Sequence, residues 1–266
     1  MAGRVEGKVA IVVGGGQTPG ETIGNGRATA MLLGREGARV LVVDRSLERA
    51  QETVDLMGEE GAKASAFAAD ITGPEANRSM VEACLERYSR IDILHNNVGA
   101  SVALGDAEAT ALEPEAFDTI VAVNLKGMWL SCKYALPVMR DQGSGSIVNI
   151  SSVAAIASYP FVGYKTTKAG VIALTENLAM ANAGHNIRVN AILPGLMNTP
   201  MAIEARVQAG ASREELIAAR DRMVPLGRKM GSGWDVAQAA LFLHSDDASF
   251  ITGVSLRVDG GGALTR

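Results

Sequence analysis

Residues 9–16 have the sequence VAIVVGGG, a run of apolar residues that leads directly into a cluster of glycines. A continuous apolar run of this length is typical of a strand buried on both faces of a sheet. Residues 24–26 (GNG) follow, and residues 27–33 (RATAMLL) have the composition of a helix. The order strand, glycine loop, helix predicts the first unit of a dinucleotide-binding α/β fold.

The alternation of strands and helices continues along the rest of the chain. We predict strands at 9–13, 40–43, 63–67, 91–95, 146–150, 187–192 and 255–258. We predict helices at 24–36, 46–60, 74–89, 114–141, 161–183, 200–222 and 235–244, with Ser46 as an N-cap and Pro74 and Pro114 in first turns. Because no linker interrupts this order, we expect residues 1–266 to form a single-domain Rossmann-type doubly wound parallel sheet. It should have about seven strands, with helices on both faces.

The composition argues against several classes of protein. The 25 basic and 29 acidic residues give a net charge of −4, and no basic stripe suggests a nucleic-acid partner. No apolar run approaches the ~20 residues that span a bilayer, and the N-terminus lacks the features of a signal peptide. Cys84 and Cys132 are too few and too dispersed for a disulfide framework or a metal site. We therefore expect a cytoplasmic protein with no membrane partner and no metal.

The glycine loop predicts where a cofactor pyrophosphate binds. Gly14, Gly16, Gly24 and Gly26 are the candidates, because a backbone without Cβ can turn sharply and approach the phosphates. The N-terminus of the following helix offers free N–H groups to the same anion. The loop is about six residues longer than a G-x-x-x-G-x-G spacing, so the sequence leaves open which glycines touch phosphate.

Asp44 ends the second predicted strand, about 20 residues beyond the glycine loop, where an acidic residue accepts hydrogen bonds from the adenosine ribose. The same carboxylate would repel the 2′-phosphate of NADP, so we predict NAD. Two features leave this open. Arg45 follows directly and could accommodate a phosphate, and Asp44 could instead cap the next helix.

Ser152, Tyr164 and Lys168 are the candidate catalytic residues. Ser152 follows the fifth predicted strand, at the end of the sheet where ligands of open α/β folds bind. Tyr164 and Lys168 are four residues apart and share one face of a helix. A phenol has a pKa of about 10, which a neighbouring cation lowers toward the range useful for proton transfer. A serine hydroxyl can hold the reacting oxygen as charge develops on it. An alcohol loses hydride only as its proton leaves, so this set of residues predicts alcohol and ketone chemistry.

Taken together, these residues resemble the short-chain dehydrogenase/reductase family over essentially the whole chain. Four more segments share its pattern: Asp70-Ile71, Asn96-Asn97-Val98-Gly99, Val123-Asn124-Leu125-Lys126-Gly127 and the stretch 190–199. The resemblance implies that Tyr164 is the general acid/base and that Ser152 stabilises the substrate oxygen. It implies that Lys168 binds the nicotinamide ribose and lowers the pKa of the phenol.

The resemblance also assigns the other site residues. Asn124 would complete a catalytic tetrad through a water near the lysine. The adenine would meet Asp70 and Ile71, and the remaining cofactor contacts would come from Asn97, Gly99, Pro194, Gly195 and Thr199, the last of which would bond the carboxamide. The family is commonly tetrameric, so we expect a homotetramer. The 12-residue gap from Ser152 to Tyr164 is one residue shorter than the family pattern.

Residues 197–225 are predicted to form a substrate-binding lid. The residues near it are mostly apolar, which favours an uncharged, apolar alcohol or ketone as the substrate. Four arginines in this stretch could instead face an anionic carrier or form a solvated helix face: Arg206, Arg213, Arg220 and Arg222. Three functions remain open: an NAD-dependent dehydrogenase of secondary alcohols, a 3-oxoacyl thioester reductase that uses NADPH, and a non-catalytic nucleotide-binding scaffold or sensor.

Overall fold

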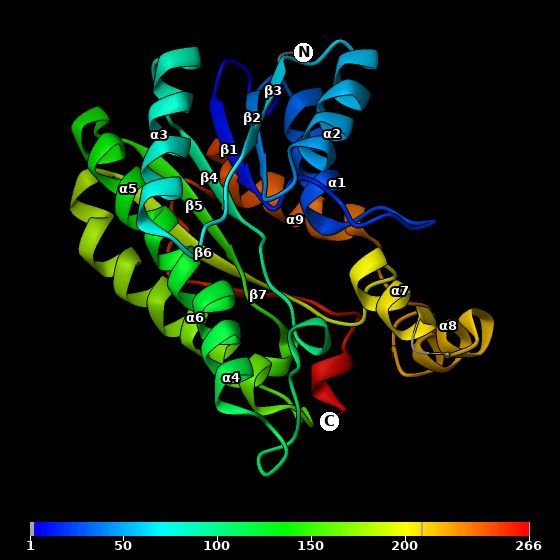
Figure 1. The fold of residues 1–266 in the computed structure, drawn as a ribbon. Helices are drawn as coiled ribbons and strands as arrows, with labels where there is room; N and C mark the ends of the chain where they lie inside the picture. Colours follow the sequence, from blue (N-terminus) through cyan, green and yellow to red (C-terminus); the bar gives the residue numbers. More distant parts are fainter. Residues whose placement is uncertain (1–2, 209, 266) are drawn as a thin grey trace.

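The first strand lies near the middle of a seven-stranded sheet in which every neighbouring pair is parallel (Figure 1). The computed structural model describes residues 3–208 and 210–265. The strands are β1 (Val9–Val13), β2 (Arg39–Asp44), β3 (Ala64–Ala68), β4 (Ile93–Asn96), β5 (Gly145–Ile150), β6 (Ile187–Pro194) and β7 (Ser255–Val258). Their order is β3-β2-β1-β4-β5-β6-β7. The chain reverses its direction of winding between β1 and β4, and ligands of such sheets bind at that crevice.

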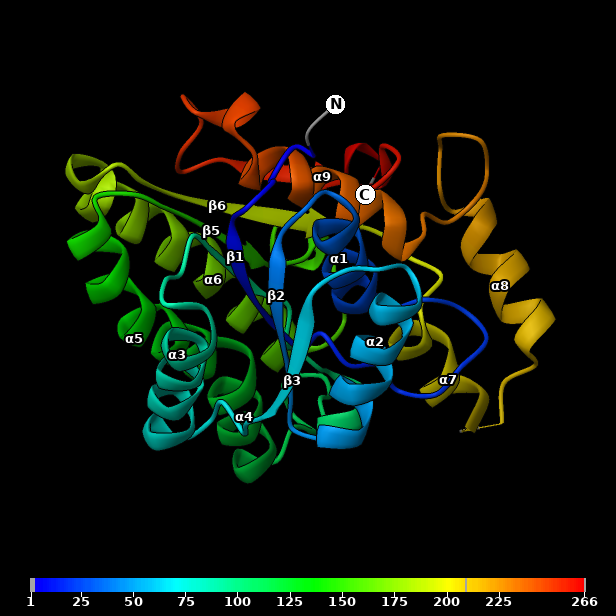
Figure 2. The same cartoon turned by 90° about the horizontal axis from the view of Figure 1, so that it is seen from above.

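Two layers of helices cover the sheet (Figures 1 and 2). One face carries α1 (Asn25–Arg35), α2 (Leu47–Glu59) and α9 (Gly233–His244), and the other carries α3 (Pro74–Tyr88), α4 (Pro114–Val121), α5 (Gly127–Gln142) and α6 (Val162–Asn182). Alternate residues of β1 enter the two cores: Ile11 packs with α3 and α5, and Val12 packs with α1 and α9. Burial on both faces explains why this strand has no polar residue.

The predicted strands and helix starts are confirmed, with small shifts at the ends. Pro74 and Pro114 lie in the first turns of their helices, and the Ser46 hydroxyl accepts from the Arg49 N–H at 3.4 Å. Among the described residues, no helix is both long and apolar enough to cross a membrane.

Two predicted helices are wrong in their continuity. The helix expected at 114–141 contains a π-helical turn, Ala122–Lys126, between α4 and α5. The helix expected at 200–222 is two helices, α7 (Pro200–Gln208) and α8 (Arg213–Arg222). It breaks because Gly210 has a φ of 98°, which no helix permits, and because Ser212 caps α8 by accepting from the Glu215 N–H at 3.4 Å. Both helices lie at one side of the sheet (Figure 2).

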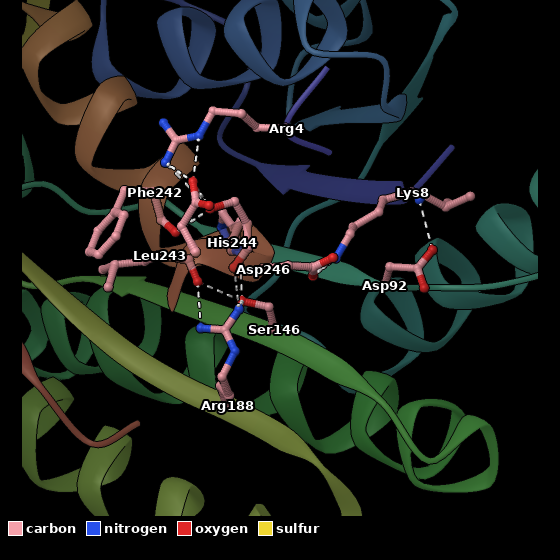
Figure 3. Close-up of polar contacts among 12 residues, drawn as sticks. Arg4, Lys8, Asp92, Ser146, Arg188, Phe242, Leu243, His244 and Asp246 are labelled. Carbon is pink, nitrogen blue, oxygen red and sulfur yellow. Dashed lines mark hydrogen bonds and ion pairs between the residues drawn. The ribbon is translucent and has the colours of Figure 1, made fainter. Parts of the chain in front are cut away.

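A polar cluster fixes the end of α9 against β5 and β6 (Figure 3). Arg188 donates from Nη1 to the carbonyl of Leu243 at 2.6 Å and from Nη2 to the carbonyl of Ser245 at 3.1 Å. Ser146 donates to the same Leu243 carbonyl at 3.2 Å. These donors satisfy carbonyl groups that the end of the helix leaves unpaired.

Two histidines are fully buried beside this cluster. Nδ1 of His95, on β4, lies 3.4 Å from Nε2 of His244, and Nδ1 of His244 lies 3.0 Å from the Ser146 hydroxyl. Burial lowers the pKa of His95 from 6.5 to about 3, and it lowers the pKa of His244 well below 6.5. Both rings are therefore neutral in the folded protein at neutral pH.

We expect acid to destabilise the protein through these two histidines. Between the unfolded pKa of 6.5 and the folded pKa of about 3 for His95, the unfolded chain binds more protons than the folded one. The stability conferred by the neutral rings is present above that window and is lost as the pH falls through it. Each histidine should contribute up to about 1.4 kcal/mol per pH unit to the fall in unfolding free energy.

Denaturant titrations between about pH 7 and about pH 5 measure this slope. His244→Asn should make it shallower, whereas His185→Asn, at an exposed histidine, should leave it unchanged. Equal slopes for both variants and the parent protein would contradict the assignment.

Candidate active site

The glycine turn after β1 contacts the end of β4 directly. Gly14 has a φ of 77°, and its carbonyl accepts from Nδ2 of Asn97 at 3.2 Å. A Cβ on Gly26 would lie 2.0 Å from the Gly14 carbonyl oxygen and 2.6 Å from Asn97 Nδ2. The structure therefore brings Gly14, Gly26 and Asn97 together, and only glycine fits at 26.

The extra residues of the glycine loop form a separate turn between Gln17 and Gly24. Gln17 closes it: Nε2 donates to the Thr22 carbonyl at 3.1 Å, and Oε1 accepts from the Gly24 N–H at 2.7 Å. A Cβ on Gly24 would have no neighbour closer than 3.6 Å. Of the four predicted phosphate glycines, Gly24 is thus the one whose surroundings do not require glycine.

Gly16 and Asp44 meet at the carboxyl ends of β1 and β2. A Cβ on Gly16 would lie 2.7 Å from Asp44 Oδ2. Asp44 Oδ1 accepts from the Ser46 N–H at 3.0 Å, while the N-cap of α2 is Ser46 itself. The carboxylate therefore faces the space above Gly16, which any side chain at that position would fill. These residues fit the adenosine ribose of a dinucleotide.

Asp70 and Ile71 lie beyond the end of β3, which pairs with β2 so that Asp44 is opposite Ala68. Asp70 Oδ1 accepts from the N–H and the hydroxyl of Thr72, at 3.0 and 2.8 Å, and these bonds hold the pKa of Asp70 below its usual value. Ile71 is buried. Asp70 and Asp44 thus follow neighbouring strands at the same edge of the sheet.

Lys168 lies on α6, buried against the end of β5. It is 2% exposed, and its Nζ donates to the carbonyl of Ile150 at 2.8 Å. Burial lowers the pKa of Lys168 to about 8. A Cβ on Gly99 would lie 2.7 Å from this Nζ, so the segment after β4 passes directly over the ammonium group.

The Tyr164 ring lies beside Lys168, with the ammonium nitrogen 5.6 Å from the ring centroid. Burial raises the pKa of Tyr164 to about 12, the Ser152 hydroxyl opposes this shift, and Tyr159 adds to it. The expected lowering of this pKa by Lys168 is therefore absent in the protein alone. The ammonium points to the Ile150 carbonyl, and burial has the larger effect on the phenol.

The structure distinguishes Ser152 from Ser151. Ser151 is buried, and its hydroxyl donates to the Lys168 carbonyl at 2.7 Å, which ties β5 to α6. The Ser152 oxygen accepts from the Ala154 N–H at 3.1 Å, and its hydroxyl lies close enough to Tyr164 to affect the pKa of the phenol. Ser152 is thus the serine that borders Tyr164.

Asn124 lies in the π-helical turn between α4 and α5, and π turns occur often at functional sites. Its Oδ1 accepts from the Ala100 N–H and its Nδ2 donates to the Ala100 carbonyl, both at 2.9 Å. Nδ2 also lies 3.2 Å from the Thr167 hydroxyl. The Asn124 amide thus joins the segment after β4 to α6, one residue before Lys168.

Pro194, Gly195 and Thr199 lie where β6 ends and α7 begins. A Cβ on Gly195 would lie 2.6 Å from Asp259 Cβ, because this turn packs on the segment after β7. Thr199 is buried, and its carbonyl accepts from the first N–H groups of α7, including that of Ala202 at 3.0 Å. Thr199 therefore joins the sheet edge to the predicted lid.

The lengthened glycine loop also contacts the predicted lid. Arg213 Nη2 lies 2.6 Å from Glu204 Oε2, and Arg213 Nε lies 3.4 Å from Glu21 Oε1. A Cβ on Gly20 would lie 2.7 Å from Glu204 Oε1. Arg213 is therefore held by two carboxylates, one on α7 and one in the glycine loop.

Two further residues, Lys165 and Asp106, contribute to this site although no sequence motif indicates them. Lys165 Nζ donates to the carbonyls of Ala154 and Ala157, at 3.1 and 2.5 Å, and so ties the shortened segment after Ser152 to the helix of Tyr164. Asp106 accepts hydrogen bonds at the start of α6. For Lys165, the 12-residue gap from Ser152 to Tyr164 was the available signal. Asp106 gave none, because a single charged residue in a loop has no periodic pattern.

Comparison with known proteins gives consistent matches along the chain. The family described as enoyl-(acyl carrier protein) reductase matches residues 21–263. A 3-oxoacyl-[acyl-carrier-protein] reductase of Thermotoga maritima is 37% identical, over 97% of this chain and 98% of that protein. A 7α-hydroxysteroid dehydrogenase of Clostridium sardiniense is 37% identical, over 98% and 95%. A crystal structure of a Burkholderia xenovorans protein assigned to the short-chain dehydrogenases/reductases has a TM-score of 0.93 at 40% identity, over 99% of both chains.

The two glycines of the GNG segment should respond differently to an added methyl group. We expect Gly26→Ala to weaken NAD binding by about tenfold or more, because its Cβ would overlap the Gly14 carbonyl and α1 would have to move. Gly24→Ala should bind NAD within about twofold of the parent, since the position is open and extended. Titration calorimetry with NAD measures both, and equal losses would contradict the contact described here.

Proposed function

We propose that this chain, which belongs to the short-chain dehydrogenase/reductase family, is an NAD-dependent dehydrogenase that interconverts an apolar secondary alcohol and its ketone. Membership makes it an oxidoreductase that acts on hydroxyl groups. The cofactor, the substrate class and the residue roles below are our proposals.

One observation carries the proposal: the Tyr164 ring lies beside the Lys168 ammonium group, 5.6 Å from its centroid, and the Ser152 hydroxyl is close enough to act on the phenol. All three follow β5 or lie on the helix after it, at the sheet end where the glycine turn and Asn97 meet. A binding protein has no need for an acid/base group in this position, so the arrangement supports catalysis.

In the direction of oxidation, Tyr164 accepts the hydroxyl proton of the alcohol while the carbon loses hydride. A bound nicotinamide supplies the hydride acceptor. Ser152 donates a hydrogen bond to the substrate oxygen, and Lys168, whose ammonium group lies beside the Tyr164 ring, would hold the nicotinamide ribose. In the reverse direction, the protonated phenol donates to the oxygen of the ketone. A phenol with a raised pKa is protonated at neutral pH, so the protein as it stands is ready for reduction and needs higher pH for oxidation.

Asp44 supports the choice of NAD. Its Oδ2 faces the space above Gly16, where two ribose hydroxyls can donate to a carboxylate and a 2′-phosphate would be repelled. Gly14 and Gly26 would hold the pyrophosphate at the start of α1. Asp70, Ile71, Asn97, Gly99, Pro194, Gly195 and Thr199 complete the proposed cofactor site.

The surroundings of Ser152 support an apolar substrate. A small cavity beside Gly195 begins at Val153, the residue after Ser152. Its other lining residues are Ala157, Met223, Val224 and Ala263, together with Leu196, Asp259 and Gly262. We propose residues 197–225 as the lid over it, with methionines that adapt to varied shapes. The 7α-hydroxysteroid dehydrogenase is a relative whose named substrate has a large apolar body.

A 3-oxoacyl thioester reductase that uses NADPH is the alternative, favoured by the similarity to the Thermotoga maritima protein. Asp44 and the pairing of Arg213 with Glu204 argue against it. The homotetramer and the cytoplasmic location stay predictions.

Absorbance of reduced nicotinamide, followed with secondary alcohols and NAD or NADP, tests the proposal directly. We expect Tyr164→Phe to retain NADH binding and to lose turnover by about 10²–10⁴-fold, the usual contribution of a general acid/base. Tyr88→Phe is the matched control, since it removes a hydroxyl that bonds Ser65 on the edge strand β3. Substantial residual activity in Tyr164→Phe would exclude this residue as the base.

Asp44→Ala should change the choice of cofactor. We expect the ratio of kcat/KM for NAD over NADP to fall by about tenfold or more, since the repulsion of a 2′-phosphate is removed. Asp55→Ala removes the same charge from an exposed position on α2 and should leave the ratio unchanged. An unaltered ratio in Asp44→Ala would show that this residue only binds the Ser46 N–H.

A further inference from the structure

The helix that carries Tyr164 has no cap of its own. Its N-cap residue, Phe161, has no side chain that can accept from the first turn. Free N–H groups at a helix start need acceptors when they are buried, and without them the first turn frays. Tyr164 lies in that first turn, two residues after Val162. The position of its phenol therefore depends on whatever closes the start of α6.

Asp106 supplies the missing acceptors from a distant loop. Oδ1 accepts from the Gly163 N–H and Oδ2 accepts from the Tyr164 N–H, both at 2.9 Å. Asp106 precedes these residues by 57 and 58 positions and lies in the segment between β4 and α4. The carboxylate therefore acts as a cap that only the folded chain can form.

The partners of the Asp106 carboxylate are the N–H groups at the start of α6. The side chain is 7% exposed, and within residues 3–208 and 210–265 no ion pair with a lysine or arginine involves it. A buried carboxylate in this position is stabilised by N–H donors and by the positive end of the helix dipole. There is little room for it to move, because a Cβ on Gly163 would lie 3.0 Å from Asp106 Oδ1.

The same carboxylate also orients the ring next to Tyr164. Ser101 donates its hydroxyl proton to Asp106 Oδ2 at 2.8 Å, and the Tyr159 hydroxyl lies 3.3 Å from the Ser101 oxygen. Since the serine proton is already used, Tyr159 is the donor to Ser101. The rings of Tyr159 and Tyr164 have centroids 5.5 Å apart. One carboxylate thus fixes the backbone of Tyr164 and the ring that packs on it.

We propose that Asp106 is a positioning residue for the reaction: it holds the first turn of α6 and Tyr159 so that the Tyr164 phenol meets the substrate oxygen. The inference rests on the proposed function, in which Tyr164 transfers the proton. Asp106 touches neither substrate nor cofactor in this role. A displacement of a reacting group by about 1 Å lowers rates by as much as 10²-fold. Loss of the cap should therefore lower kcat even in a protein that still folds.

Asp106→Asn is the test variant, because it keeps the shape but places an amide –NH₂ opposite one of the two backbone donors. Asp235→Asn is the matched control. Asp235 is a carboxylate in the capping box of α9, where Oδ2 accepts from the Ser232 N–H at 2.7 Å. Both variants lose a charged helix cap, and only one of the helices carries Tyr164.

We expect Asp106→Asn to lower kcat about tenfold or more while the KM for NAD and the NADH dissociation constant stay within about twofold. Hydrogen exchange should accelerate in the peptide 159–168 and not in the peptides of α9. Asp235→Asn should lower the melting temperature and exchange protection of α9 at unchanged kcat. If Asp106→Asn does not fold, Ser101→Ala frees Tyr159 alone and should lower kcat about threefold.

A kcat within about twofold of the parent in the folded Asp106→Asn protein would overturn the positioning role while leaving the proposed function intact. A fall in kcat matched by Asp235→Asn would also overturn it, since loss of any cap would then have the same effect. Absence of turnover in the parent protein, across the alcohols and ketones with both cofactors, would refute the proposed function itself and this inference with it.

Discussion

The close approach of three strand ends is the constraint on which the rest of this structure depends. The turn after β1 touches the segment after β4 at Gly14 and Asn97. That segment passes at Gly99 over Lys168, whose Nζ donates to Ile150 at the end of β5. Neither Gly26 nor Gly99 has room for a Cβ. The proposed phosphate site and the proposed proton-transfer group are thereby held to one crevice. A methyl group at either glycine would separate parts that the chemistry needs in contact.

The buried ammonium group of Lys168 is the second element of this arrangement. Its ammonium nitrogen donates to the Ile150 carbonyl, and among residues 3–208 and 210–265 no carboxylate forms an ion pair with it, so burial moves its pKa to about 8. The neighbouring Tyr164 side chain is half-buried, and desolvation raises its pKa to about 12. Two groups that burial pushes in opposite directions lie side by side, and such pairs are typical of sites that transfer protons.

Long-range contacts hold the residues around Tyr164. Asp106 reaches the start of α6 from the loop before α4, Lys165 holds the segment after Ser152, and Asn124 joins Ala100 to Thr167. Arg213 likewise joins α7 and α8 to the lengthened glycine loop through Glu204 and Glu21. The proposed acid/base residue and the proposed lid are therefore held by contacts that join their helices to segments distant in sequence.

The sequence by itself determined the alternation of strands and helices and the parallel sheet, since apolar periodicity and turn residues act over a few neighbouring positions. Its motifs also carried the resemblance to the family. It also placed Ser152, Tyr164 and Lys168 near one another, because strand ends and a four-residue helix spacing are local geometry. Only the tertiary structure decided that the stretch 200–222 breaks at Gly210 and that Asp106 caps α6. It also decided that a Cβ has room at position 24 but not at position 26. These features depend on contacts between atoms that are distant in sequence, so no local sequence pattern contains them.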